Sequence, residues 1–373
     1  MKKAVVGMSG GVDSSIAAHL LKQKGCSVTG ISFVLYEPGY KAGCAASACC
    51  SISSVNDAAS AAAALGIEHK VIDLRKTFRS EVVEPFISAY TKGMTPNPCV
   101  LCNMKIKFPY LLQTAIELGA DIISTGHYAQ IERSPRKVNI ADSEISTNYA
   151  LKQGVDERKD QSYVLYGLKH RELACLDLPL GRMRKTDVRR LAEDLGLPSA
   201  GRPESQEICF VEGKDYLSLL DGAAQDIEGP MINIVTGREI GRHKGIHRYT
   251  IGQRKRLGIA SLKPMFVVRI DPDNNAVYIG PRETAMMRKF SVSSLNWLVD
   301  LPSALHDGKA GFRASVKVRS TMKEQPAVVE LRADGSAKVV FDHPQWAPAP
   351  GQSAVFYHQD LVLGGGVIDL FRF

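Results

Sequence analysis

The segment SGGVDSS, Ser9–Ser15, constrains the fold of this chain more than any other. It lies between a short apolar run, KAVVGM, and a helix-like run, SSIAAHLLKQKG, so it occupies a strand-to-helix turn. Gly10 and Gly11 have no Cβ, which lets the backbone turn sharply and bring its N–H groups against an anion. The N-terminus of the following helix adds further N–H groups and a positive dipole end. The segment therefore predicts a phosphate-binding loop at the first βα turn of a parallel sheet.

The polar side chains of this loop suit the same chemistry. Ser14 and Ser15 can donate hydroxyl hydrogen bonds, and Asp13 can hold Mg²⁺ through its carboxylate oxygens. The loop is not of the Walker A type, because no G-K-[ST] follows it. A glycine-rich turn capped by serines, without a ligand, is the alternative interpretation.

Strand-like and helix-like runs alternate through residue 210, which predicts an α/β domain with a parallel sheet covered on both faces. The expected strands are 3–8, 26–36, 69–74 and 121–129, and the expected helices are 14–25, 54–66, 79–93, 106–120, 161–168 and 185–196.

The pattern changes after residue 210 to short alternating runs joined by Gly, Asn and Asp turns. DPDNN at 271–275 and ADGS at 333–336 are hairpin signals. We expect three domains: an α/β domain at 1–210, a small β-rich domain at 211–285 and a β-barrel at 286–373.

The segment TPNPCVLCNMKIKF, residues 95–108, contains a C-x-x-C pair, Cys99 and Cys102. A closed zinc site needs about two more ligands, and the later candidates Cys175 and Cys209 are single and distant. With eight cysteines and no sign of secretion, thiol chemistry or a metal is favoured over a structural disulfide framework. For Cys209 alone, a small buried apolar side chain is the simpler interpretation.

A second group of cysteines, Cys44, Cys49 and Cys50, follows the second expected strand in GCAASACC. A flexible or redox-sensitive loop is the first interpretation of this segment, and a second metal site is the alternative.

Charge and hydropathy limit the partners of the chain. The net charge of +8 favours a polyanionic partner, and the basic segment HKGIHRYTIGQRKRLG is either a solvated loop or a surface that follows phosphates. No apolar run is long enough to span a membrane, and the N-terminal apolar run meets a glycine loop within a few residues. We therefore expect a cytoplasmic protein without a membrane partner.

Five motifs, GMSGGVDSS, TPNPCVLCN, TGHYA, KDQSYVL and SQEICF, resemble in order and spacing those of the tRNA-specific 2-thiouridylases, which are N-type ATP pyrophosphatases. The resemblance covers residues 1–215 and continues more weakly through HRYTIGQRKRLGI, FVVRID and APGQSAVFY. It implies a Rossmann-like ATP-pyrophosphatase domain, a central tRNA-binding domain and a C-terminal barrel.

The resemblance also implies a reaction: ATP adenylylates O2 of uridine 34 in a tRNA anticodon, and sulfur then replaces that oxygen. A persulfide on Cys209 attacks C2, and Cys102 is the partner thiol that releases the sulfur by forming a disulfide with Cys209. A sulfur donor or relay protein must supply the persulfide. The residues matched to ATP are Gly7, Met8, Ser9, Gly10, Gly11, Val12, Asp13, Ser14, Phe33 and Gly126. Those matched to tRNA are Asn97, Pro98, Cys99, His127, Lys159, Asp160, Gln161, Arg319, Ser320 and Gln352.

One residue departs from the family pattern, because Cys99 stands where the family has Asp, an acid/base candidate beside the target base. Related thiolases bind a [4Fe–4S] cluster through a C-x-x-C pair and one distant cysteine, and Cys99, Cys102 and Cys209 match that ligand count. A cluster-dependent tRNA thiolase, or a non-enzymatic protein that binds RNA or iron–sulfur clusters, are the alternative functions.

Overall fold

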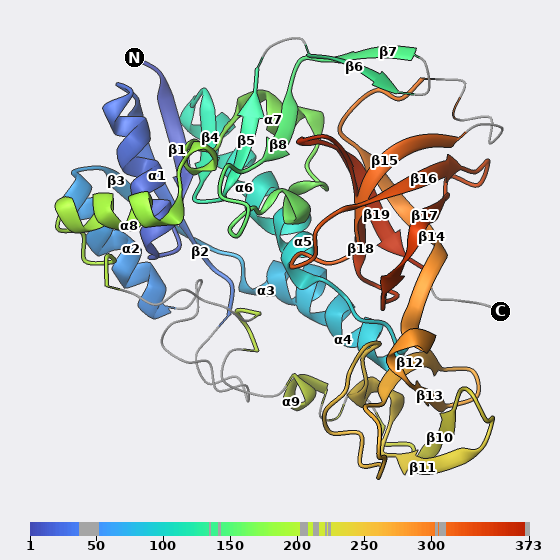
Figure 1. Ribbon diagram of the computed structural model, residues 1–373. Coiled ribbons are helices and arrows are strands. Elements are labelled where there is room, and N and C mark those ends of the chain that lie inside the picture. The colour runs from blue at the N-terminus through green and yellow to red at the C-terminus, as the bar shows by residue number, and fades with distance from the viewer. Residues whose placement is uncertain are drawn as a thin grey trace.

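The computed structural model describes residues 1–36, 52–133, 136–140, 143–201, 208–211, 216–220, 222, 225–302, 305 and 311–369. The α/β part lies on the left of Figure 1, a sheet of long strands on the right, and a small β module below it. The expected fold class, α/β followed by two β-rich parts, is confirmed.

The α/β part is built on a parallel sheet with the strand order β3-β2-β1-β4-β9. Val5 and Val6 of β1 and Ile123 of β4 are at most 1% exposed, as expected where helices cover both faces of a parallel sheet. The strands are β1 (Lys3–Gly7), β2 (Ser27–Val34), β3 (Glu68–Asp73), β4 (Ile122–Thr125) and β9 (Leu176–Asp177). The glycine loop follows the carboxyl end of β1, the central strand of this sheet. It therefore lies at the edge where open α/β sheets bind ligands.

The α-helices of this part are α1 (Val12–Gln23), α2 (Ile52–Leu65), α3 (Arg75–Phe78), α4 (Glu84–Thr91), α5 (Pro98–Cys102), α6 (Phe108–Leu118), α7 (His170–Cys175) and α8 (Lys185–Asp194). Two π-helical turns, η1 (Arg79–Val83) and η2 (Asn103–Lys107), interrupt them, and two 3₁₀ turns are η3 (Ser162–Leu165) and η4 (Pro179–Arg182).

Two sequence predictions were wrong in this part. The strand expected at 121–129 ends at Thr125, because its partner β1 ends at Gly7, the residue paired with Thr125. Gly126 then packs so closely that a Cβ there would lie 2.7 Å from backbone atoms of Asp13 and Ser14. The helix expected at 161–168 is only the 3₁₀ turn η3. Here tertiary contacts outweigh helical periodicity: the Tyr163 hydroxyl donates to the Ser353 carbonyl at 2.8 Å, and Ser353 Oγ donates to the Tyr166 hydroxyl at 3.2 Å.

The C-terminal strands form a sheet that closes on itself, because β14 pairs with both β17 and β19. They are β14 (Met286–Trp297), β15 (Gly311–Lys317), β16 (Gln325–Leu331), β17 (Ala337–Trp346), β18 (Ser353–His358) and β19 (Leu361–Ile368). Besides β9, four strands of the α/β part were not predicted from the sequence: β5 (Ala129–Glu132), β6 (Arg136–Ile140), β7 (Ser143–Thr147) and β8 (Ala150–Gln153). Two of them, β5 and β8, extend the C-terminal sheet beside β19, so the two parts share one sheet.

The small module at the bottom of Figure 1 carries a sheet with the order β11-β10-β13-β12. Its elements are α9 (Leu217–Leu220), β10 (Gly229–Asn233), β11 (Glu239–His243), η5 (Ile246–Arg248), β12 (Phe266–Asp271), β13 (Ala276–Gly280) and η6 (Arg282–Ala285). Gly93, after α4, approaches it so closely that a Cβ would lie 2.7 Å from Ile270. Among the helices of the described residues, none is long and apolar enough to cross a membrane.

Candidate active site

The glycine loop has the geometry of an anion-binding turn between β1 and α1. Gly10 has φ +75°, and a Cβ there would lie 2.4 Å from the Ser54 carbonyl oxygen, so only glycine fits. Inside the turn, Ser9 N–H donates to Ser14 Oγ at 3.2 Å, and Ser14 Oγ donates to the Gly11 carbonyl at 3.0 Å. These bonds fix the turn, and Gly11 caps α1 without a side chain that would cover the first N–H groups.

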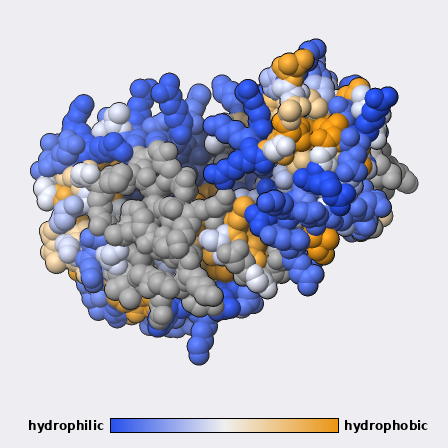
Figure 2. Space-filling view, turned by 90° about the horizontal axis from the view of Figure 1, so that it is seen from below, coloured by the Kyte–Doolittle hydropathy of each residue, from blue (hydrophilic) through white to orange (hydrophobic). Residues whose placement is uncertain are grey.

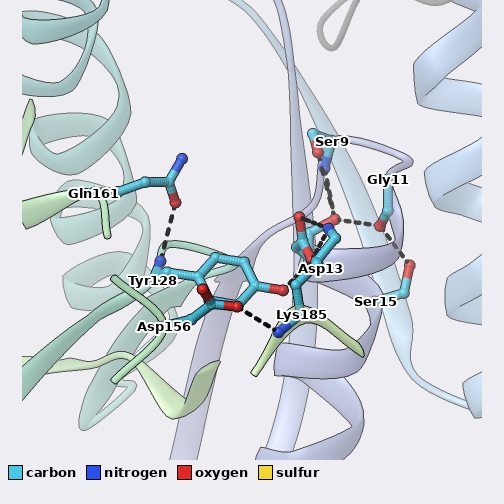
Figure 3. Close-up of polar contacts among 9 residues, drawn as sticks. Ser9, Gly11, Asp13, Ser15, Tyr128, Asp156, Gln161 and Lys185 are labelled. Carbon is cyan, nitrogen blue, oxygen red and sulfur yellow. Dashed lines mark hydrogen bonds and ion pairs between the residues drawn. The ribbon is translucent and has the colours of Figure 1, made fainter. Parts of the chain in front are cut away.

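Asp13 lies at the centre of a charged cluster that joins three segments (Figure 3). Lys185 Nζ donates to both Asp13 carboxylate oxygens, at 2.6 and 2.7 Å, and the Tyr128 hydroxyl donates to Oδ1 at 2.7 Å. The side chain of Lys185 is only 10% exposed, and its backbone N–H donates to Asp156 Oδ2 at 3.0 Å. Sequence analysis missed Lys185 and Tyr128, because no local pattern relates the first residue of α8 to a loop 172 residues earlier.

The same cluster extends to the KDQSYVL segment. Tyr128 N–H donates to Gln161 Oε1 at 2.9 Å, and Gln161 N–H donates to the Tyr128 carbonyl at 2.8 Å. The neighbouring Asp160 carboxylate is 4% exposed and accepts from Ser162 Oγ at 2.9 Å, with Lys317 Nζ at 3.7 Å. Asp160 and Gln161 therefore have internal partners, and their contact with tRNA stays a prediction.

The cysteine segment is connected to the glycine loop through α6. The ring of Phe108, the first residue of α6, lies 5.8 Å from the ring of His127, and His127 Nδ1 is 2.7 Å from Thr125 Oγ1. Gly126, between Thr125 and His127, packs against the backbone of Asp13. A continuous set of contacts thus joins the cysteine-bearing helix to the glycine loop.

Cys99 and Cys102 lie on the short helix α5. Asn97 caps its N-terminus by accepting from Val100 N–H at 3.3 Å, and Pro98 occupies the first turn. Cys99 is exposed, Cys102 is buried at 6% exposure, and Cys209 is half-buried against the same hydrophobic core that contains Cys102. Cys44, Cys49 and Cys50 lie outside the described residues.

The three candidate cluster ligands are all described, yet no set of three or more His, Cys, Asp or Glu side chains is placed to hold a metal ion within the described part of the chain.

The remaining predicted site residues are distributed over the three parts. Phe33 is 7% exposed near the end of β2, and Lys159 is half-buried. Ser320 is exposed, whereas Arg319 donates through Nη2 to the Ala347 carbonyl at 2.8 Å and the Ile251 carbonyl at 3.1 Å.

The basic segment of the small module presents exposed cations. Arg254, Lys255 and Arg256 are exposed, while Arg248 pairs with Asp226 at 2.6 Å and so lowers the pKa of that carboxyl. Figure 2 shows the face seen from below, where hydrophilic side chains lie beside several groups of hydrophobic ones. The exposed cations of the basic segment suit a polyanionic partner.

Three family models match consecutive parts of the chain. They are described as the tRNA methyl transferase HUP domain at residues 2–213, the tRNA methyl transferase PRC-barrel domain at 218–281 and the aminomethyltransferase beta-barrel domain at 287–368.

Full-length relatives are also similar. A tRNA-specific 2-thiouridylase MnmA of Thermoanaerobacter sp. (strain X514) is 42% identical over 369 residues, 98% of either chain. Those of Pelotomaculum thermopropionicum and Acetivibrio thermocellus are 41% and 40% identical over at least 98% of each chain. Among solved structures, a 4-thiouridine synthetase–RNA complex with bound ATP is 16% identical and covers 60% of this chain and 51% of its own. Its TM-score of 0.36 is too low to support a conclusion.

Proposed function

The chain belongs to the tRNA-specific 2-thiouridylase family, and from this premise we propose that it replaces O2 of uridine 34 in a tRNA anticodon with sulfur, at the expense of ATP. The observation that carries the proposal is the connection of the glycine loop, through Gly126, His127 and Phe108, to the helix that bears Cys102. The glycine loop, where ATP would activate the oxygen, is therefore connected by direct contacts to the helix that carries the thiol for sulfur transfer.

The glycine loop is where ATP would bind. The backbone N–H groups after Ser9 and the N-terminus of α1 favour the phosphates, and Gly126 keeps the adjacent backbone close to the loop. Mg²⁺, when bound with the nucleotide, neutralises phosphate charge. Asp13 has the oxygen ligands that Mg²⁺ prefers, and Lys185 Nζ donates to both of them, which fixes the direction of this carboxylate beside the loop.

The sulfur step requires two thiols. Attack of uracil O2 on the α-phosphorus of ATP forms an O–P bond and releases pyrophosphate. The oxygen O2, a poor leaving group by itself, can then leave C2 as part of AMP. The terminal sulfur of a Cys209 persulfide then attacks C2, and the C2–O2 bond breaks as AMP leaves. The Cys102 thiolate attacks Cys209 Sγ, which breaks the persulfide S–S bond and leaves the transferred sulfur on C2. A thiol reductant must afterwards reduce the Cys102–Cys209 disulfide by two electrons.

Access to the base favours an anticodon loop as substrate. C2 of a uracil lies inside a stacked helix, and unstacking costs least in a single-stranded loop. The exposed cations Arg254, Lys255 and Arg256 can bind the backbone of such an RNA. Cys99 is the exposed thiol of α5, and we assign it a position beside the base.

The experiment is reconstitution with purified protein, ATP, Mg²⁺, an in vitro transcript of a tRNA with U34, and a persulfide donor. Nucleoside mass spectrometry should show 2-thiouridine with wild-type protein and none with Cys102→Ser or Cys209→Ser, whereas Cys26→Ser should stay active. Thiolation at another position, or of a transcript with U34 replaced by C, would refute the proposed substrate.

The cluster-dependent alternative is tested in the same assay. Protein without iron, checked by metal analysis, should thiolate at the same rate as protein purified anaerobically. A requirement for iron would instead favour the cluster with Cys99, Cys102 and Cys209 as ligands.

A further inference from the structure

The C-terminal barrel holds the loop that leads to the two cysteines of α5. The turn between β17 and β18, residues 347–352, lies against residues 95–97 of the α/β part. Thr95 N–H donates to the Pro350 carbonyl at 2.7 Å. Gln352 Nε2 donates to the Thr95 carbonyl at 3.0 Å and to the Pro96 carbonyl at 3.3 Å. One barrel side chain thus binds two successive carbonyls of this loop.

The loop depends on these partners because of its sequence. Pro96 and Pro98 have no N–H, so the segment has few backbone donors with which to satisfy its own carbonyls. The Thr95 and Pro96 residues are half-buried, and buried carbonyls need donors. Gly351, with φ +88°, allows the close approach, since a Cβ there would lie 3.0 Å from N, C and O of Thr95.

The β17–β18 turn is itself fixed to the barrel. Gly351 N–H donates to the Ile368 carbonyl at 2.9 Å, and Ile368 N–H donates to the Gln352 carbonyl at 2.8 Å. At the start of the turn, Arg319 holds the Ala347 carbonyl at 2.8 Å. The amide of Gln352 is therefore presented from a rigid element, which is what a positioning group requires.

The loop determines where α5 begins and how it is oriented. Asn97 caps the helix, Pro98 opens it, and Cys99 and Cys102 lie within its five residues. The five residues of α5 run directly into η2 and α6, with helical backbone angles at Asn103 and Phe108. The direction of α5 is therefore shared with α6, while the start of its first turn depends on the loop that precedes it.

We propose that Gln352 is a positioning residue for sulfur transfer: it holds the backbone of residues 95–96 so that α5 presents Cys99 and Cys102 correctly. This role rests on the proposed function. It assigns to the barrel a part in the chemistry of the α/β domain.

The test compares Gln352→Ala with Gln345→Ala, a barrel glutamine whose amide donates only to the nearby His343 carbonyl among the bonds described. Amide hydrogen exchange is measured without tRNA or ATP, followed by steady-state thiolation. In Gln352→Ala, exchange in the peptide containing residues 94–104 should rise about tenfold, because two hydrogen bonds to one loop are lost. The kcat should fall about tenfold while KM for tRNA stays within twofold of the wild type.

A further variant and the barrel itself provide the controls. Gln352→Glu keeps the length but offers acceptors to two carbonyls, so it should lose as much activity as Gln352→Ala or more. Unchanged exchange in strands β15 to β19 shows that the barrel remains folded. Unchanged exchange at 94–104, or a raised KM for tRNA with kcat retained, would overturn the inference in favour of a tRNA contact. An inactive wild-type protein would instead refute the proposed function.

Discussion

Replacing Lys185 by Met should destabilise both the fold and the nucleotide site. The change removes the ammonium that lies on both oxygens of Asp13, at 2.6 and 2.7 Å, and leaves a carboxylate with the Tyr128 hydroxyl as its described donor. Removal of one partner from a buried ion pair costs about 3–5 kcal/mol. The Asp13 side chain is 33% exposed, so water compensates in part, and we expect a loss of about 1–3 kcal/mol.

The assay is urea unfolding together with calorimetric titration of ATP. In Lys185→Met the Asp13 carboxylate loses the ammonium that fixes its position, so ATP binding should weaken about tenfold, which corresponds to about 1.4 kcal/mol. The matched control is Lys24→Met, which breaks the exposed ion pair with Asp177 at 3.1 Å and should change stability by less than about 0.5 kcal/mol.

A double-mutant cycle decides whether the two residues act as a pair. Asp13→Asn and Lys185→Met should be strongly non-additive, because either change alone leaves the other group without its charge partner. Additive effects, or a Lys185→Met protein that matches Lys24→Met in stability and ATP affinity, would refute this account of the cluster.

Three further outcomes follow from the same structure. Gly126→Ala should weaken ATP binding at least tenfold by calorimetry, because its Cβ would lie 2.7 Å from the loop backbone, whereas Gly201→Ala, with nothing within 4 Å, should bind normally. Iodoacetamide followed by mass spectrometry should label exposed Cys99 well before Cys175, because burial raises the pKa of the Cys175 thiol; equal rates would contradict this. Burial likewise raises the pKa of Glu172, so the folded protein binds this proton more tightly than the unfolded chain, and stability should fall as pH rises above 4.5 through the raised value. Urea unfolding of Glu172→Gln across this range should lack that component, and an unchanged pH profile would count against the assignment.

The fold class and the position of the glycine loop could be predicted from the amino-acid sequence alone. Gly10 and Gly11 between an apolar strand and a helix can adopt few other structures, and the structure requires glycine at position 10, where φ is +75°. Local patterns also placed β1 to β4 and the helices of eight or more residues in the α/β part, since periodicity and turn residues act over short separations.

Contacts between residues far apart in the sequence depend on the arrangement of the strands and helices. Lys185 lies 172 residues from Asp13, and Gln352 lies 257 residues from Thr95, so the contacts exist because the strand order and the shared sheet bring these segments together. The same cause turned the expected helix at 161–168 into a 3₁₀ turn, where Tyr163 binds the barrel. Sequence motifs named the thiols and the loop, whereas the side chains that hold Asp13 and the cysteine segment in place depend on packing between elements, which no local pattern encodes.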